Sequence, residues 1–107
     1  MPRRRRFTII FAPETLAHLE VLERNDHRLI RQAIDKQLSF LPEQVTRNRK
    51  LLEQPAPFGA TWELRFGPDN RFRVFYEVAA NTRVINILAI GVKKRNKLVI
   101  GGEEFEP

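Results

Sequence analysis

The sequence predicts a single α+β domain, with an N-terminal strand and a two-helix hairpin packed on a small antiparallel sheet. In the first half of the chain apolar residues recur at helical spacing, and in the second half they alternate with polar residues. Because helices and strands are segregated along the chain, the pattern is typical of the α+β class. The 107 residues suffice for one hydrophobic core, so we expect one domain over residues 1–107.

The first half contains the predicted helices. FTIIF at residues 7–11 is β-branched and aromatic and predicts a strand. Leucines at spacing three predict a helix over residues 13–24, and a wide apolar stripe predicts a second helix over residues 25–41, capped by its Asn-Asp start. Residues 43–60 contain prolines and a glycine, and predict a short helix that runs into a loop.

The second half predicts a three-stranded meander. Residues 62–66 and 71–78 alternate apolar and polar side chains, and GPDN between them predicts a turn. Residues 84–90 are apolar on both faces apart from one asparagine, as expected for an interior strand. The inner face of the sheet should pack on the helices. The residues expected on the outer face are Glu63, Arg65, Arg71 and Arg73. The conformation of residues 101–107 is left open.

The chain is strongly basic, with 19 lysines and arginines against 13 acidic residues and a formal net charge of +6. This balance predicts a polyanionic partner such as nucleic acid or the ribosome, and a merely soluble cationic protein is the alternative. The chain has no cysteine, which excludes disulfides and thiolate sites and fits a reducing compartment. No apolar run approaches the roughly 20 residues that span a bilayer. We therefore expect a cytoplasmic protein with no membrane partner.

Motifs for metal or cofactor binding are not evident. His18 and His27 lack the spacing of metal ligands and predict structural or exposed roles. The glycines form neither a dinucleotide-binding fingerprint nor a P-loop. We therefore expect no metal and no cofactor. Trp62 and Phe75 could stack on bases, and Phe75 is the better candidate because it has the parity of the outer face.

The strongest candidate for chemistry is a group of charged residues on the outer face. Arg65 and Arg73 lie on strands joined by a tight turn and share one parity, so their guanidinium groups should share one surface. Lys93-Lys94-Arg95, which follows the last predicted strand, would extend this surface into a cationic concavity. Such a site could grip a phosphodiester and stabilise a pentavalent transition state. Glu63 could accept a proton from a ribose 2′-hydroxyl, or orient an arginine.

The plain alternative is a pair of solvated strand faces, on which a Glu–Arg pair contributes less than about 1 kcal/mol. Other residues near this face are candidates for nucleic-acid contact because they are cationic or aromatic. They are Arg47, Arg49, Lys50, Arg71, Phe75, Lys93 and Lys97.

The segment TWELRFGPDNRFRVFYEV at residues 61–78, followed by INILAIGVKKRN at residues 85–96, resembles the second half of the RelE/ParE superfamily of type II toxin–antitoxin toxins. The leading strand and helix pair have the same order, so the resemblance covers nearly the whole chain. It implies two helices on an antiparallel sheet, and a cognate antitoxin that wraps the toxin and masks its basic face. RelE-like members cleave mRNA on the ribosome without metal. ParE-like members instead poison DNA gyrase and are not nucleases.

The resemblance assigns roles to individual residues. It places Arg65 where RelE-type toxins have a lysine on the catalytic face, and Arg73 at their arginine that stabilises the transition state. Either Lys94 or Arg95 matches the arginine after the last core strand. Glu63 stands where RelE itself has another lysine.

The chain departs from the RelE pattern in its C-terminal segment. Leu98-Val99-Ile100 occupies the positions where RelE-type nucleases carry a tyrosine, and Tyr76, the one tyrosine of the chain, has core parity. The first hypothesis is a ribosome-dependent mRNA endonuclease that inhibits translation, with the ribosome and mRNA as partners. The alternative is a binding protein without catalysis, either a ParE-like inhibitor of DNA gyrase or a cleavage-deficient RNA- or ribosome-binding member.

Overall fold

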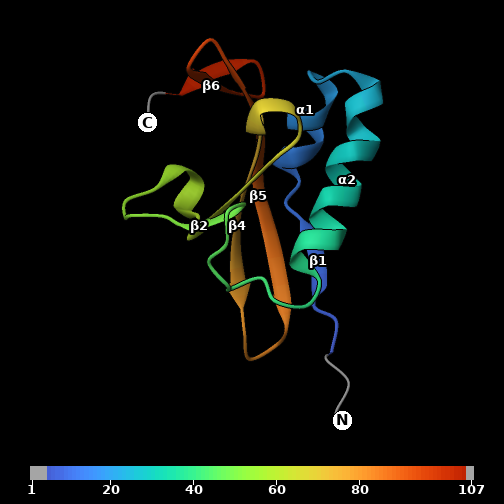
Figure 1. The fold of residues 1–107 in the computed structure, drawn as a ribbon, viewed down its shortest axis with the longest axis vertical. Coiled ribbons are helices and arrows are strands. Elements are labelled where there is room, and N and C mark those ends of the chain that lie inside the picture. The colour runs from blue at the N-terminus through green and yellow to red at the C-terminus, as the bar shows by residue number, and fades with distance from the viewer. Residues whose placement is uncertain (1–4, 106–107) are drawn as a thin grey trace.

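The computed structural model describes residues 5–105, in which two helices lie on one side of a sheet (Figure 1). The helices are α1 (Glu14–Glu20) and α2 (Arg24–Leu38). The strands are β1 (Thr8–Phe11), β2 (Arg49–Leu51), β3 (Trp62–Phe66), β4 (Phe72–Ala79), β5 (Val84–Lys94), β6 (Lys97–Ile100) and β7 (Glu103–Phe105). This architecture confirms the predicted α+β class. None of the helices between residues 5 and 105 has the length and apolarity to cross a membrane.

The sheet is built around the long strand β5. Strands β2 to β7 follow one another in sequence order, and each is antiparallel to the next. Strand β1 instead runs parallel to β5 and pairs with residues 84–87, while β6 pairs with residues 91–94 of the same strand. Because β4 occupies the other edge of β5, β1 and β6 share one edge and leave a gap between them.

The main core lies between the sheet and α2. Ile30, Ile34 and Leu38 recur every four residues and form a stripe that is fully buried against the inner face. Alternation along the strands brings side chains such as Leu64 and Val74 to meet them. Each such fully buried aliphatic side chain contributes about 1.5–3 kcal/mol relative to an exposed one. Packing therefore determines which side chains of the strands face α2, and the polar residues that alternate with them must lie on the outer face of the sheet.

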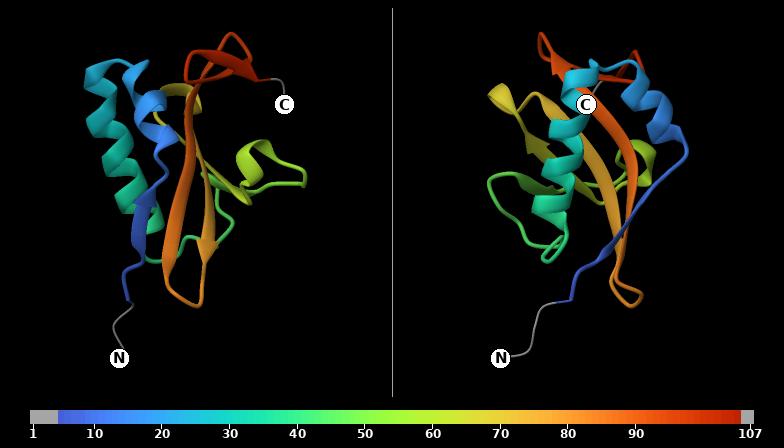
Figure 2. Two further views of the ribbon diagram at one scale, coloured as in Figure 1. Left: turned by 180° about the vertical axis from the view of Figure 1, so that it is seen from behind. Right: turned by 90° about the vertical axis from the view of Figure 1, so that its right-hand side faces the viewer.

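A second, smaller apolar cluster covers part of the outer face. Its buried members are Ala60, Phe75, Ala89 and Ile100. The loop after β2 and the β6–β7 hairpin both lie on the side of the sheet away from α2 (Figure 2). They touch through Phe58 and Phe105, whose ring centroids are 5.4 Å apart. The outer face is therefore walled along one end rather than open to solvent.

Strand β5 contains an irregularity that changes which side chains face outward. Phe75 of β4 pairs with Ala89, but the next residue, Tyr76, pairs with Ile87, so Leu88 is an extra residue in β5. A bulge of this kind shifts the alternation by one position. Ile87 lies on the inner face before the bulge, and Ile90 lies on it after the bulge.

Three predicted elements differ from the structure. The first helix ends at Glu20 rather than near residue 24, and the second begins at Arg24 after an extended Glu23 rather than at the Asn-Asp pair. The short helix that residues 43–60 were expected to begin with is wrong, because this segment forms β2 and then a loop, and the loop contains one 3-10 turn over Pro57–Gly59. Pairing of β2 with β3 prevails over local helix propensity there. Residues 101–107, for which the sequence predicted no conformation, include β7, and residues 106–107 lie outside the described part of the chain.

His18 fills the gap between β1 and β6. Its Nδ1 accepts a hydrogen bond from the backbone N–H of Ile90 at 3.2 Å. The ring is buried and meets Phe58 edge-on, and a Cβ on Gly101 would lie 3.2 Å from its Cδ2. This confirms the predicted structural role for His18. Burial lowers the pKa of His18 from its ordinary value of 6.5, and the Glu14 carboxylate opposes this shift without cancelling it.

Acidification should therefore destabilise the fold through His18. The unfolded chain takes up a proton on this ring near pH 6.5, whereas the folded chain does so only at lower pH. The contribution of neutral, buried His18 to the free energy of unfolding is complete above pH 6.5. It is lost as the pH falls toward the folded-state pKa, and the free energy of unfolding decreases by no more than about 1.4 kcal/mol per pH unit. Denaturant unfolding between about pH 7.5 and about pH 5.5 measures this slope. His18→Gln should flatten this slope; an unchanged slope in His18→Gln contradicts the assignment.

Candidate functional site

The β3–β4 hairpin brings the predicted outer-face arginines together. Arg65 of β3 is the direct partner of Arg73 of β4, so both side chains project from the same face. Gly67 begins the connecting turn at φ 82°, and a Cβ there would lie 2.6 Å from the Phe72 ring. Only glycine fits this position. The expectation that the two guanidinium groups share one surface is confirmed.

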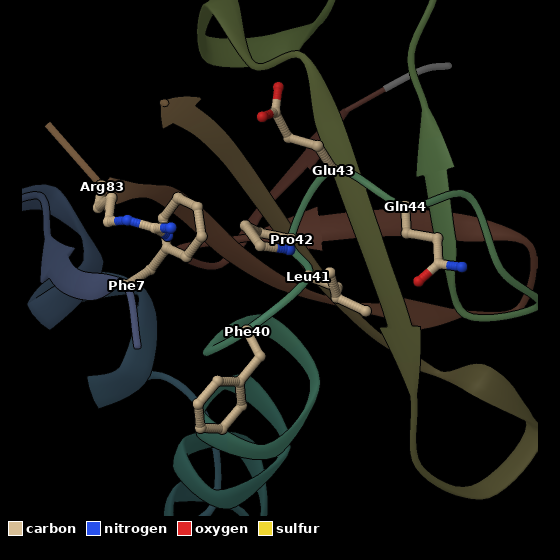
Figure 3. A pocket seen from close by; sticks show the side chains of 7 residues that line it. All are labelled: Phe7, Phe40, Leu41, Pro42, Glu43, Gln44 and Arg83. Carbon is tan, nitrogen blue, oxygen red and sulfur yellow. The ribbon is translucent and has the colours of Figure 1, made fainter. Parts of the chain in front are cut away.

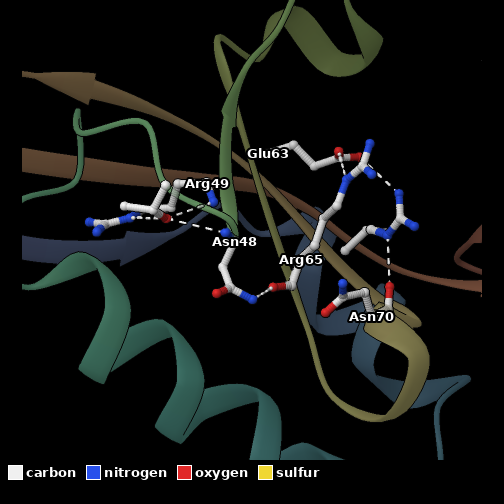
Figure 4. Close-up of polar contacts among 7 residues, drawn as sticks. Asn48, Arg49, Glu63, Arg65 and Asn70 are labelled. Carbon is white, nitrogen blue, oxygen red and sulfur yellow. Dashed lines mark hydrogen bonds and ion pairs between the residues drawn. The ribbon is translucent and has the colours of Figure 1, made fainter.

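Glu63 contacts both arginines, and its contact to Arg65 is drawn in Figure 4. Arg65 Nε donates to Glu63 Oε1 at 2.6 Å, and Arg73 Nη1 lies 3.6 Å from Glu63 Oε2. Arg73 Nε also donates to the backbone carbonyl of Asn70 at 3.0 Å, which fixes the direction of this side chain. We call Glu63, Arg65 and Arg73 the Glu63 cluster. Each oxygen of the carboxylate therefore faces a different guanidinium group.

Burial differs within the Glu63 cluster. The side chains of Glu63 and Arg73 are only 7% and 10% exposed, whereas that of Arg65 is 34% exposed. Burial lowers the pKa of Arg73, the positive charge of Arg65 acts in the same direction, and Glu63 opposes both. Arginine remains charged at neutral pH even so. The cluster thus holds two positive charges and one negative charge in a region of reduced dielectric.

The cluster forms part of a cavity of about 280 Å³ on the outer face, which we call the outer-face pocket. The residues after β2 form an apolar wall, and Phe75 and Leu98 add apolar surface. Lys50 and Lys93 contribute two further cations, so a small cationic pocket with one apolar side results. Its lining residues are Lys50, Leu52, Glu53, Pro55, Ala56, Pro57, Glu63, Arg65, Arg73, Phe75, Lys93, Asn96 and Leu98.

Strand β2 is anchored beside the pocket by main-chain pairing. Lys50 is the partner of Glu63 across β2 and β3, which places it on the outer face. The Asn48 side-chain amide donates to the Arg65 carbonyl at 2.8 Å, and the Arg65 N–H donates to the Asn48 carbonyl at the same distance (Figure 4). The lysine is therefore positioned by the backbone rather than by its own contacts.

Phe75 has the predicted outer parity but not the predicted exposure. It is only 2% exposed, because the loop after β2 and the β6–β7 hairpin pack over it. Its ring contributes to the pocket lining, but it does not present a free face for stacking over the sheet. The expectation of an exposed aromatic is therefore corrected to a buried one at the edge of the pocket.

Four cations that were expected near the outer face lie elsewhere. Lys94 and Arg71 line a separate hollow on the helix side, where Arg71 Nη2 is 3.1 Å from Asp26 Oδ2 of α2. The outer-face position predicted for Arg71 is therefore wrong, since its side chain turns toward α2. Lys97 pairs with Glu104 of β7 at 3.5 Å. Arg95 is exposed in the β5–β6 turn and does not line the pocket.

The two arginines before the meander also separate. Arg47 is exposed in the loop and does not line the pocket. Arg49 is buried on the helix side of β2, where its guanidinium donates to the backbone carbonyls of Gln37, in the last turn of α2, and of Leu41, just after this helix. Its position is that of a structural residue, closed off from a large ligand.

Asn96 and the wall after β2 were missed by the sequence reasoning. Arg95 and Asn96 both have positive φ, 50° and 66°, and connect Lys94 to its partner Lys97. This is a two-residue hairpin turn of the kind that favours asparagine, so Arg95-Asn96 could have predicted a hairpin at this point of the sequence. The paired prolines 55 and 57 pointed to an irregular segment, but nothing in them indicated which face it covers.

A larger cavity, of about 550 Å³, lies near β1 and the end of α2 (Figure 3). It is lined by Phe7, Phe40, Leu41, Pro42, Glu43, Gln44 and Arg83, and includes none of the predicted site residues. The outer-face pocket is the better candidate because it combines four cations with a buried carboxylate. Within residues 5–105 no group of three or more His, Asp or Glu side chains is placed to hold a metal ion.

The sequence matches the family model described as "ParE toxin of type II toxin-antitoxin system, parDE" over residues 9–97. No curated protein matches the sequence. The matched region runs from within β1 to the first residue of β6 and includes the whole Glu63 cluster. The family implies an antitoxin as partner. The chain therefore belongs to the ParE toxin family, within the RelE/ParE superfamily of type II toxin–antitoxin toxins.

Proposed function

We propose that this toxin binds an RNA phosphodiester in the outer-face pocket and cleaves mRNA on the ribosome, which inhibits translation. The observation that carries the proposal is the Glu63 cluster, with two guanidinium groups beside Lys50 and Lys93 in one pocket. Guanidinium groups match the geometry of phosphate oxygens. Cations that are already in place stabilise charge that develops in the transition state without reorganisation.

The proposed reaction is attack of the ribose 2′-oxygen on the adjacent phosphorus. The O2′–P bond forms, the P–O5′ bond breaks, and the products are a 2′,3′-cyclic phosphate and a 5′-hydroxyl. Arg73 and Arg65 stabilise the added negative charge, and Glu63 is the candidate base for the 2′-hydroxyl proton. Lys93 takes the place expected for Lys94 or Arg95, because it lines the pocket and they do not.

The second candidate function is inhibition of DNA gyrase by binding alone. Tyr76 supports it, because this tyrosine is fully buried and its hydroxyl donates to the Pro42 carbonyl at 2.7 Å. Burial also raises its pKa, which makes it a poorer proton donor. Leu98 and Val99 offer no group that transfers a proton. The proton for the leaving 5′-oxygen must therefore come from a lysine or from water.

Mapping of mRNA 5′ ends separates the two functions. Purified toxin is mixed with translating ribosomes, or with the same mRNA alone, and supercoiling by purified gyrase is measured in parallel. Codon-phased cuts that need ribosomes, with normal supercoiling, are the expected result. Loss of supercoiling with intact mRNA rejects the nuclease and supports the second candidate.

A further inference from the structure

We infer that Glu63 is an internal competitor for the phosphate ligand, so that its carboxylate occupies the guanidinium donors which RNA would otherwise use. The inference rests on the proposed phosphate binding in the outer-face pocket. It concerns affinity rather than the chemical step. It predicts that removing this negative charge strengthens RNA binding, even though Glu63 is also the candidate base.

The contacts within the Glu63 cluster are those that a phosphate would make. Arg65 Nε donates to one carboxylate oxygen at 2.6 Å, and Arg73 Nη1 approaches the other at 3.6 Å. Carboxylate and phosphate both present oxygens that accept from guanidinium forks. An arriving phosphate must either take these donors from Glu63 or bind beside its negative charge.

The low exposure of Glu63 makes this competition effective. At 7% exposure its carboxylate is poorly screened by water, so its attraction to Arg65 and its repulsion of a second anion are both strong. Arg65 is the partner that can move, because it is the more exposed arginine and Arg73 is tied to the Asn70 carbonyl. Part of the gain from an Arg65–phosphate contact is therefore offset by loss of the Arg65–Glu63 contact.

Glu53 provides a matched control for charge. It lines the same pocket but is exposed, and among residues 5–105 it forms no ion pair. Glu53→Gln removes the same charge from the same pocket without releasing an arginine. A general charge effect would act through both acids, whereas competition acts through Glu63 alone.

The test measures binding of a fluorescent single-stranded 2′-O-methyl RNA, which lacks the hydroxyl needed for cleavage. Glu63→Gln should bind about tenfold more tightly than wild type, and Glu53→Gln should change the affinity by less than about threefold. The plot of log K against log salt should steepen by about 0.7 in Glu63→Gln, as one more phosphate contact requires. A merely structural role for Glu63 would not steepen it. Unchanged or weaker binding by folded Glu63→Gln, equal gains in both variants, or no binding by any protein would overturn the inference.

A second comparison does not depend on folding of the Glu63 variant. In the wild-type background Lys93→Gln should weaken RNA binding more than Arg65→Gln, because Arg65 is already engaged and Lys93 forms no ion pair among the described residues. The opposite order contradicts competition. Tighter binding by Glu63→Gln, together with no cleavage of natural mRNA by the wild type, would keep this inference and reject the nuclease. Cleavage by the wild type, without tighter binding by Glu63→Gln, would reject this inference and keep the nuclease.

Discussion

Arg73→Ala should lower ribosome-dependent mRNA cleavage by about 10³-fold, the upper end of the range for loss of one fixed donor to a developing anion. Arg73 is 10% exposed and held by Glu63 and the Asn70 carbonyl, so its guanidinium group is fixed at the site of the developing charge. Glu63 keeps its shorter contact to Arg65 in this variant, which should preserve the fold. The measurement is the rate of cleavage at mapped sites, with circular dichroism and thermal unfolding as checks on folding.

Arg71→Ala is the matched control for Arg73→Ala. It removes the same side chain two residues earlier, where the guanidinium pairs with Asp26 on the opposite side of the sheet. Cleavage should remain within about threefold of wild type, because exposed ion pairs contribute little. A folded Arg73→Ala protein with full activity would remove Arg73 from the mechanism.

Arg49→Met should cost about 3–5 kcal/mol in the free energy of unfolding, the largest stability effect that we expect from one cation. The Arg49 guanidinium donates to the carbonyls of Gln37 and Leu41 and approaches the Thr46 hydroxyl at 3.4 Å. Methionine preserves most of the side-chain volume but donates nothing. The Gln37 carbonyl in the last turn of α2 would then lose this donor, and the Leu41 carbonyl would keep only its contact to the Gln44 N–H at 3.4 Å, next to the negative end of the helix dipole.

The comparison for Arg49→Met is Arg47→Met, in the exposed loop two residues earlier. This change should alter the unfolding free energy by less than about 0.5 kcal/mol in denaturant titrations. A cost below about 1 kcal/mol for Arg49→Met would mean that water satisfies the α2 carbonyls. A large effect of Arg49→Met on RNA binding with normal stability would return this residue to the binding surface.

The sequence was sufficient to predict those features that depend only on the local repeat of apolar and polar side chains. Strands have a period of two, so WELRF and RFRVFYEV fix which side chains face the helices, and the register of Arg65 with Arg73 follows from the short turn. The helical stripe of Ile30, Ile34 and Leu38 is equally local. The class, the helix pair and the two central arginines could therefore be predicted.

The sequence was insufficient where contacts distant along the chain decide. Arg49 looked like another surface cation, and only the position of the α2 terminus makes it a buried donor. Phe75 was expected to be exposed, because the hairpin that covers it could not be placed.

The alternation of side chains along β5 could not be predicted for a different reason. Without the extra Leu88, continued alternation would turn Lys94 outward, but the bulge turns Lys93 outward instead.

The bulge in β5 also bears on how toxins of this kind diversify. Three consecutive cations follow the bulge along the chain. Which lysine lines the pocket therefore depends on the number of residues in β5 before it, and not on the identity of the side chain. Loss or gain of one residue upstream would exchange the pocket lysine for its neighbour and leave every codon of the basic segment unchanged. Related chains could thus place different cations in the pocket through single-residue insertions and deletions. An alignment of their basic residues would then pair positions that face opposite sides of the sheet.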